Sequence, residues 1–253
     1  SAKQTKLREL DTRLLEINDA QIEFCLLRGC LGFGKINHLL RSCPPSAVQS
    51  SFESFDERLK LLFQMILRTP FELTETAWTQ ASLSIQKGGL GLFHSSRISL
   101  VAYIASVAQC HSLTSAILRC DPVDYNPLLA KDSLTSFNGR YNEVLLYDDM
   151  IDRKGFQHLL SIKIWDHIYK DLIYQAEVSH DLRRQAHLRA ICLDHANDYL
   201  HAPPIPGLGL RVSSRLFQTM LQRHLDLPIF HPQKLPTCSF CKKTFDRFGD
   251  HAS

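Results

Sequence analysis

The feature of this sequence that most constrains its fold is a run of apolar residues spaced three or four positions apart. Phe52, Phe55, Leu59, Leu62 and Ile66 follow this spacing, and charged residues occupy many of the positions between them. That period places the apolar side chains on one face of an α-helix, and the pattern stops at a proline, residue 70. The segment therefore predicts an amphipathic helix that buries one face, with Leu59 in the core.

The same period recurs along most of the chain and predicts a mostly α fold. Helices are expected over residues 3–30 and 36–43, and over 74–82. Others should run from a cap at Ser95 or Ser96 to about Ala108, over 141–150, 156–176 and 178–199, and from a cap at Ser213 or Ser214 to about Leu225. Residues 119–140 predict a loop with a helical turn. Leu208–Val212 is the segment most typical of a β-strand.

Composition excludes several broad classes of protein. The chain has 253 residues, of which 44% are hydrophobic and 22% charged, as in soluble globular proteins. No apolar run approaches the roughly 20 residues that cross a bilayer, and no charged and apolar leader opens the sequence. We therefore expect neither a membrane protein nor a secretory precursor. The first residue is Ser1 rather than Met, which is compatible with a piece of a longer protein.

The net charge of +3 is too small to indicate a partner, but its distribution is informative. From residue 201 onward seven Lys and Arg face three Asp, a balance of +4, whereas the first 200 residues carry 22 basic and 23 acidic side chains. Basic clusters attract phosphate groups. The tail therefore predicts nucleic-acid contacts through Arg211, Arg215, Lys242, Lys243 and Arg247.

Two short motifs look catalytic but are better explained structurally. Gly88-Gly89-Leu90-Gly91 lacks the following Lys and Ser/Thr of a phosphate loop and is predicted to be a turn. Asp148-Asp149 resembles the paired aspartates of a two-metal polymerase hairpin. The surrounding pattern instead predicts a solvated acidic helix end. No nucleophile lies in a recognisable catalytic setting. We therefore assign no catalytic residues and expect this segment not to be an enzyme.

The cysteines fall into two groups. Six are scattered through helical patterns and are expected to be buried thiols: Cys25, Cys30, Cys43, Cys110, Cys120 and Cys192. Cys238 and Cys241 instead form a C-x-x-C pair, the spacing that brings two thiolates to a tetrahedral Zn²⁺. His251 supplies a third ligand, and a fourth is missing unless His231 returns to the site. The alternative is two incidental thiols and a surface histidine.

Aromatic residues accompany the cysteine pair. Phe240, Phe245 and Phe248 alternate with the basic residues of the tail. Aromatic faces beside Lys and Arg are typical of binding sites for single-stranded nucleic acid. We therefore expect weak, salt-sensitive binding of RNA or DNA by residues 201–253.

Several motifs, taken in order, resemble one protein family. They are Asn37-His38-Leu39-Leu40-Arg41-Ser42-Cys43-Pro44-Pro45, Phe55-Asp56, Trp78-Thr79-Gln80-Ala81, Gly88-Gly89-Leu90-Gly91-Leu92 and Ala102-Tyr103-Ile104-Ala105-Ser106. The tail adds Cys238-x-x-Cys241 and Phe248-Gly249-Asp250-His251-Ala252. Together they resemble the region after the polymerase palm in reverse transcriptases of non-LTR retrotransposons that carry a restriction-like endonuclease.

The resemblance implies a division of the chain and a supporting role. Residues 1–72 would be a thumb-like unit of three helices, 73–200 a helical linker, and 201–253 a small irregular tail with an incomplete CCHC zinc knuckle. In the family the fourth ligand is a Cys that would fall just past Ser253, the catalytic aspartates lie upstream and the nuclease carboxylates downstream. The resemblance thus implies a non-catalytic, nuclear piece that holds template RNA or target DNA. The alternative is a helical interaction scaffold, such as a decayed element fragment, without nucleic-acid binding.

Overall fold

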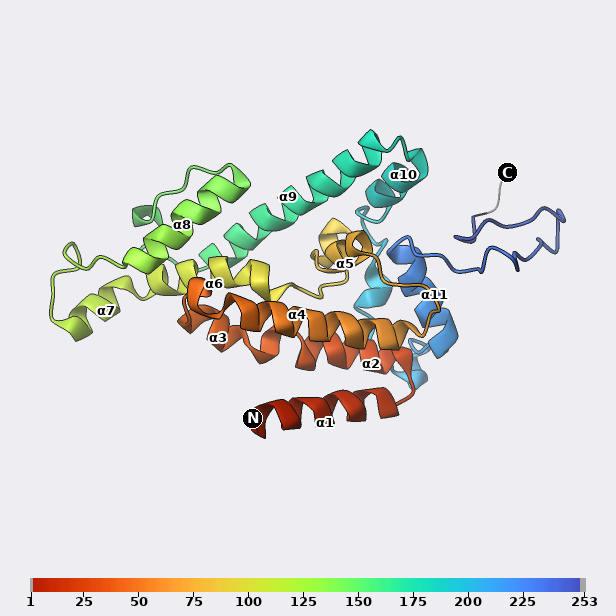
Figure 1. Ribbon diagram of the computed structural model, residues 1–253, viewed down its shortest axis with the longest axis horizontal. Helices are drawn as coiled ribbons and strands as arrows, with labels where there is room; N and C mark the ends of the chain where they lie inside the picture. Colours follow the sequence, from red (N-terminus) through yellow and green to blue (C-terminus); the bar gives the residue numbers. More distant parts are fainter. Residues whose placement is uncertain (1, 251–253) are drawn as a thin grey trace. The chain divides into compact units, whose positions relative to one another are not determined.

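The computed structural model describes residues 2–250, with side chains from residue 6 onward, and its fold is mostly α as predicted (Figure 1). Within these residues no β-strand forms, and the only β-type pairing is an isolated antiparallel bridge between Thr237 and Thr244. The strand predicted at Leu208–Val212 is wrong. Pro206–Leu208 forms a 3-10 turn, η6, and Gly209 ends it with a positive φ of 68°. That conformation suits glycine and breaks an extended chain.

Contacts divide the chain into two compact units, each assembled from stretches that are distant in sequence. Unit 1 contains Ser1–Cys30, Leu59–Leu92 and Asp171–Ser253, and unit 2 contains Leu31–Arg58 and Phe93–Lys170. The division expected from sequence was consecutive, with boundaries at 72 and 200. The observed units differ from it, since unit 1 contains segments from both sides of each boundary and unit 2 contains segments from both sides of residue 72.

The predicted amphipathic helix is α4 (Pro45–Leu67), which begins at a proline, a residue favoured in the first turn. All five apolar residues of its three-four pattern are buried, and Leu59 is only 1% exposed. This confirms the predicted helix and its buried face. The single helix expected over 3–30 is wrong, since α1 (Ala2–Glu16) and α2 (Ala20–Leu26) are separated by Asn18 in a left-handed conformation.

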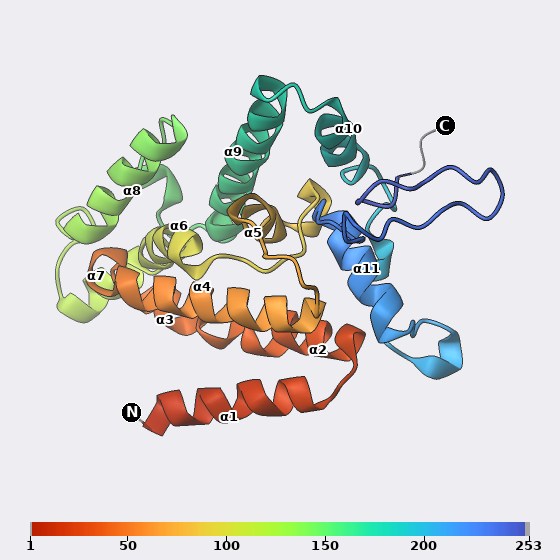
Figure 2. The ribbon, with the colours of Figure 1, turned by 45° about the vertical axis from the view of Figure 1, so that its right-hand side comes forward.

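The core of unit 1 is an aromatic cluster. The ring of Phe24 on α2 lies 6.1 Å from Phe63 and 5.7 Å from Phe217 on α11 (Ser214–His224), and Phe63 stacks on Trp78 of α5 (Glu75–Ala81). Helix α11 packs against α2 and crosses it at a steep angle near the end of α2, as Figure 2 shows. Predicted helices at 74–82 and from Ser213 are thus confirmed, and both Thr74 and Ser213 cap them with their side-chain oxygens.

The Gly88–Gly91 turn follows η3 (Ile85–Lys87) and is structural, as predicted. A side chain on Gly89 would place its Cβ 2.1 Å from the carbonyl oxygen of Leu83, so only glycine fits. The Gly88 carbonyl accepts hydrogen bonds from Gln80 Nε2 (3.1 Å) and His224 Nε2 (3.0 Å). The turn therefore joins α5 to the end of α11 inside unit 1.

Unit 2 is built around α6 (Ser95–Gln109), which packs against α3 (Asn37–Ser42) and α8 (Leu128–Tyr141). Ser95 and Ser96 do not cap α6 as predicted, since they lie in its first turn. Their backbone N–H groups donate to the Asp56 carboxylate at 2.7 and 2.9 Å. Asp56 is 6% exposed, so α4 supplies the buried cap for α6.

Unit 2 also corrects two expectations from the sequence. Residues 119–140 contain the helix α8 rather than a loop, and 141–150 are irregular apart from a 3-10 turn, η4 (Asp148–Met150). Asp148 and Asp149 are exposed in that turn, and no strand of the described chain flanks them. Helix α7 (His111–Leu118) follows α6 directly.

The remaining helices differ in length from their predictions. Helix α9 (Phe156–Val178) matches the one predicted at 156–176, whereas α10 (Leu182–Ala190) covers only part of the predicted 178–199. The short 3-10 turns η2 (Phe33–Lys35) and η5 (Asp198–Leu200) and the π-helix η1 (Leu27–Leu31) complete the described elements. No single described helix is both long and apolar enough to cross a membrane. Helices α6 and α7 meet the length and composition required for a membrane span only when they are taken together, and a 59° bend separates them.

The six scattered cysteines, all among the described residues, form no disulfide, but the prediction that they are buried is wrong. Cys30 and Cys110 are exposed, and the other four are half-buried. Their apolar neighbours suggested that these thiols are buried. That inference holds only where a regular helix continues through the cysteine, since only there does the period of the sequence define the buried face. Cys30 lies instead in the π-helix, and Cys110 lies at the break between α6 and α7.

Candidate nucleic-acid interface in the C-terminal tail

The tail after α11, residues 226–250, forms a two-armed loop held by backbone hydrogen bonds. Phe245 N donates to the Pro236 carbonyl (2.9 Å), and Cys238 N donates to the Lys243 carbonyl (2.8 Å). These bonds flank the Thr237–Thr244 bridge, so the two arms run side by side as an elongated loop (Figure 1). The cysteine pair lies at the turn of this loop. The tail is therefore an ordered loop of two paired arms, with the predicted C-x-x-C turn at its tip.

The turn at the cysteine pair favours a thiolate. The backbone N–H groups of Cys241 and Phe240 lower the pKa of the Cys238 thiol from its ordinary value. Lys242 closes the turn with a positive φ of 61°, and its backbone N–H donates to the Cys238 carbonyl at 3.0 Å. Backbone donors that favour a thiolate also favour a metal bond to sulfur.

The structure describes only two of the predicted zinc ligands. Cys238 and Cys241 share the turn, whereas His251 lies outside the described residues. In the described part of the chain no group of three or more metal-ligating side chains gathers. The two cysteines fit a metal by donor type and spacing, and a complete ligand set would need residues beyond those described.

The base of the tail is anchored to α10 and α11 by ion pairs that the sequence did not suggest. Arg183 donates from two nitrogens to the Asp226 carboxylate at 2.6 and 2.9 Å, and its guanidinium lies 3.7 Å from the ring centre of Phe248. Arg223 donates to Asp250 at 2.7 Å, which contributes to lowering the pKa of that carboxyl. The segment next to the predicted ligand His251 is therefore fixed at its near end.

The three phenylalanines of the tail have different surroundings. Phe248 lies between the guanidinium groups of Arg183 and Arg247, and Phe245 lies 6.3 Å from the ring of Phe230. Phe240, in the turn itself, is 94% exposed. Only Phe240 thus presents an open ring among the three that were predicted to stack on bases.

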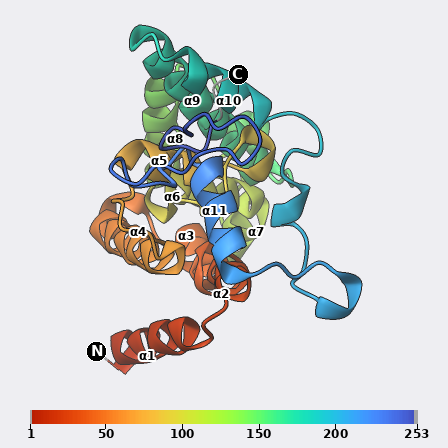
Figure 3. The same cartoon turned by 90° about the vertical axis from the view of Figure 1, so that its right-hand side faces the viewer.

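The predicted basic residues also differ in their surroundings. Arg211 donates to the Asp19 carboxylate at 3.0 and 2.5 Å, so its charge supports the N-terminal cap of α2. Figure 3 shows that the chain before α11 loops out from the helix. Arg211 precedes the first residue of α11, Ser214, and so does not share a helix face with Arg215. Arg215 is exposed on α11, while Lys242, Lys243 and Arg247 are exposed in the tail.

Comparisons with known proteins do not indicate a function for this geometry. No protein-family model, curated protein or solved structure matches the chain. The function must therefore be argued from the residues themselves.

Proposed function

We propose that this chain is a non-catalytic piece of a reverse transcriptase of the non-LTR retrotransposon kind, and that its tail holds single-stranded RNA or DNA. By the same proposal the parent protein works in the nucleus, and polymerase and nuclease activity reside in other parts of it. The ordered motifs resembling that family support the identity. The geometry of the turn at Cys238–Cys241 supports the binding role.

One observation carries the binding role. Phe240 exposes 94% of its surface in a turn whose next residues include the exposed Lys242 and Lys243. Leaving a phenylalanine in water is unfavourable, and a base stacked on its ring would remove that surface from water. The two lysines add positive charge to the same short loop, and such charge attracts the phosphates of a bound strand.

Zinc is proposed as a structural partner of this turn. Cys238 and Cys241 would hold the ion through thiolates, with His251 and a residue outside the chain completing the set by family resemblance. A bound metal would fix the turn that presents Phe240. It would take no part in a reaction.

The test is fluorescence anisotropy of a labelled single-stranded RNA titrated with the full chain at two salt concentrations, with and without added zinc. We expect micromolar binding at low salt that weakens steeply at high salt. Phe240→Ala should weaken binding about tenfold, because one stacked base contributes roughly 1–3 kcal/mol. Lys242→Glu/Lys243→Glu should abolish it at the higher salt.

The matched control is Lys6→Glu/Arg8→Glu, which makes the same change in net charge on exposed positions of α1. Binding should survive that control. Loss of binding in both double variants would show only a dependence on total charge and would refute the assignment to the tail. Absence of binding by the unchanged chain at low salt would refute the function.

The alternative, a helical interaction scaffold, has one observation in its favour. Helix α7 exposes large apolar side chains, with Leu113 64% and Ile117 71% exposed. Apolar residues four positions apart on a helix surface are typical of a face that contacts another protein. If the RNA titration fails, this scaffold role becomes the better explanation.

A further inference from the structure

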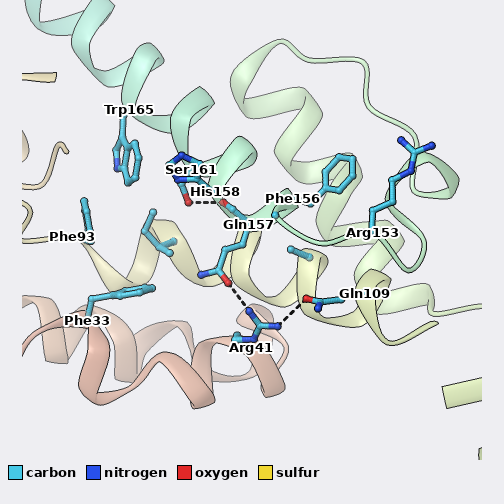
Figure 4. Close-up of a pocket in the computed structure, with 13 residues that line it drawn as sticks. Phe33, Arg41, Phe93, Gln109, Arg153, Phe156, Gln157, His158, Ser161 and Trp165 are labelled. Atoms are coloured by element: carbon cyan, nitrogen blue, oxygen red, sulfur yellow. Dashed lines mark hydrogen bonds between the residues drawn. The ribbon is translucent and has the colours of Figure 1, made fainter. Parts of the chain in front are cut away.

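Unit 2 contains a cavity of about 340 Å³ between α3, α6 and the start of α9. This volume lies at the lower end of the range for small-molecule sites. Figure 4 shows three aromatic rings at one end, from Phe33, Phe93 and Trp165, and polar side chains toward the other. All the residues that line it belong to unit 2, so the cavity is distinct from the tail.

The aromatic end is a continuous wall of rings. Phe93 stacks on Trp165 with ring centres 5.1 Å apart and planes 23° from parallel, and Phe33 meets Phe93 edge-on at 5.9 Å. Phe33, Phe93 and Trp165 are each only half-buried. Such a wall offers a stacking surface to one more planar ring.

The guanidinium of Arg41 is held at this cavity by two side chains that carry no charge. Arg41 donates to the side-chain oxygens of Gln157 (2.9 Å) and Gln109 (3.3 Å), as drawn in Figure 4. Both acceptors are neutral, so they orient the guanidinium and leave its charge uncompensated. Arginine held in this way is suited to a phosphate or carboxylate, with which it makes its strongest hydrogen bonds.

The remaining lining adds one more positive charge and no negative charge. Arg153 also lines the cavity, and none of the described residues that line it is Asp or Glu. The first turn of α9 lies at the cavity and carries no acidic residue, and the positive end of a 23-residue helix favours an anion there. The ligand should therefore pair a planar ring with a negative charge.

We propose that this cavity binds a nucleotide, with the base against the aromatic wall and the phosphate toward Arg41 and Arg153. The ligand chemistry is a nucleobase bearing a phosphate. It can be supplied by a free mononucleotide or by one residue of a single strand. The site lies in a different unit from the tail and does not depend on the function proposed for it.

The experiment uses the fluorescence of Trp165 in the full chain. The chain has two tryptophans, and Trp78→Phe leaves Trp165 as the only one. Adenosine and uridine monophosphates, the corresponding nucleosides and a short single-stranded RNA are titrated separately. Titration of free N-acetyltryptophanamide corrects for light absorbed by the nucleotides.

We expect saturable quenching with a midpoint below about 1 mM, and binding at least about tenfold weaker for nucleosides, which lack the phosphate. Arg153→Gln, at the exposed rim, should weaken nucleotide binding about tenfold, and Arg41→Gln more. Lys154→Gln is the matched control, since it removes the same charge from the neighbouring position, which does not line the cavity. Circular dichroism verifies that each variant is folded.

Tighter binding of the RNA than of the mononucleotides would identify the strand as the source, and the reverse order would identify the free nucleotide. Absence of saturable quenching by any of these ligands would overturn the proposal. It would also be overturned by equal losses in Arg153→Gln and Lys154→Gln, or by nucleosides that bind as well as nucleotides. Lys242→Glu/Lys243→Glu should leave the quenching by mononucleotides unchanged, so failure of the cavity to bind them and failure of the tail to bind RNA are distinguishable.

Discussion

Helix α11 and the tail that follows it belong to the same unit but are stabilised by different forces. Helix α11 buries Phe217 and Leu221 to 2% and 0% exposure, and His224 at its end is 5% exposed. The tail instead relies on backbone hydrogen bonds and on the ion pairs of Arg183 and Arg223. Apolar burial is little affected by salt, whereas partly exposed ion pairs are screened by it. The tail can therefore loosen while α11 stays packed.

The first prediction removes the core on which α11 depends and has the largest effect. Leu59→Asp places an unpaired carboxylate at a position 1% exposed on α4, so the free energy of unfolding should fall by about 4 kcal/mol or more. Thermal melting followed by circular dichroism measures it. Leu61→Asp is the matched control on the same helix, at a position 56% exposed, and should change stability by less than about 1 kcal/mol. Equal losses in the two variants would contradict the buried face of α4.

The second prediction separates the two regions by pH. Burial lowers the pKa of His224 to about 4, with Arg184 and His187 adding positive charge nearby, while its Nδ1 accepts from Tyr199 at 3.2 Å. The unfolded chain therefore binds a proton that the folded chain does not, between about pH 6.5 and pH 4. The contribution of His224 to the free energy of unfolding is fully present above pH 6.5. It is lost as the pH falls toward 4, and the loss amounts to about 3 kcal/mol.

The measurement is the slope of unfolding free energy against pH between these limits, for the unchanged chain and for His224→Gln. The variant should show a smaller slope, although His187, whose pKa burial also lowers, keeps part of it. The pKa of Asp250 lies below its ordinary value of 3.8, so the ion pair between Arg223 and Asp250 should persist through this range. Identical slopes in the two proteins would exclude His224 as the source.

The third prediction acts on the tail and has the smallest effect on stability. Arg183→Ala removes the pair with Asp226 and the guanidinium on Phe248, and should cost about 1–2 kcal/mol because the group is one-third exposed. Amide exchange at Phe245 and Cys238 should quicken, while exchange within α11 should not. Arg189→Ala, which removes a 63% exposed arginine 3.6 Å from Glu177, should change neither rate. Faster exchange throughout α11 would show that the two regions are not separate.

Some of the candidate interface was predictable, because it depends on residues close together in sequence. The C-x-x-C spacing and its neighbouring lysines already specify a turn with two sulfurs and two cations. The surroundings of Phe245 and Phe248 were not predictable. Their contact partners, Phe230 and Arg183, come from outside the motif. The same holds for Arg211, whose partner Asp19 is 192 residues away.

The sequence by itself determined the elements whose signal is local and periodic. Helix α4 follows from its three-four pattern, and the start of α11 follows from the cap at Ser213. Only the tertiary structure decided which polar side chains are buried. Asp56 looks like a solvated residue of an amphipathic helix, yet it caps α6 across unit 2. The cavity has the same origin, since Arg41, Phe93 and Trp165 come from distant segments. Contacts of that kind depend on how helices pack, which no local period records.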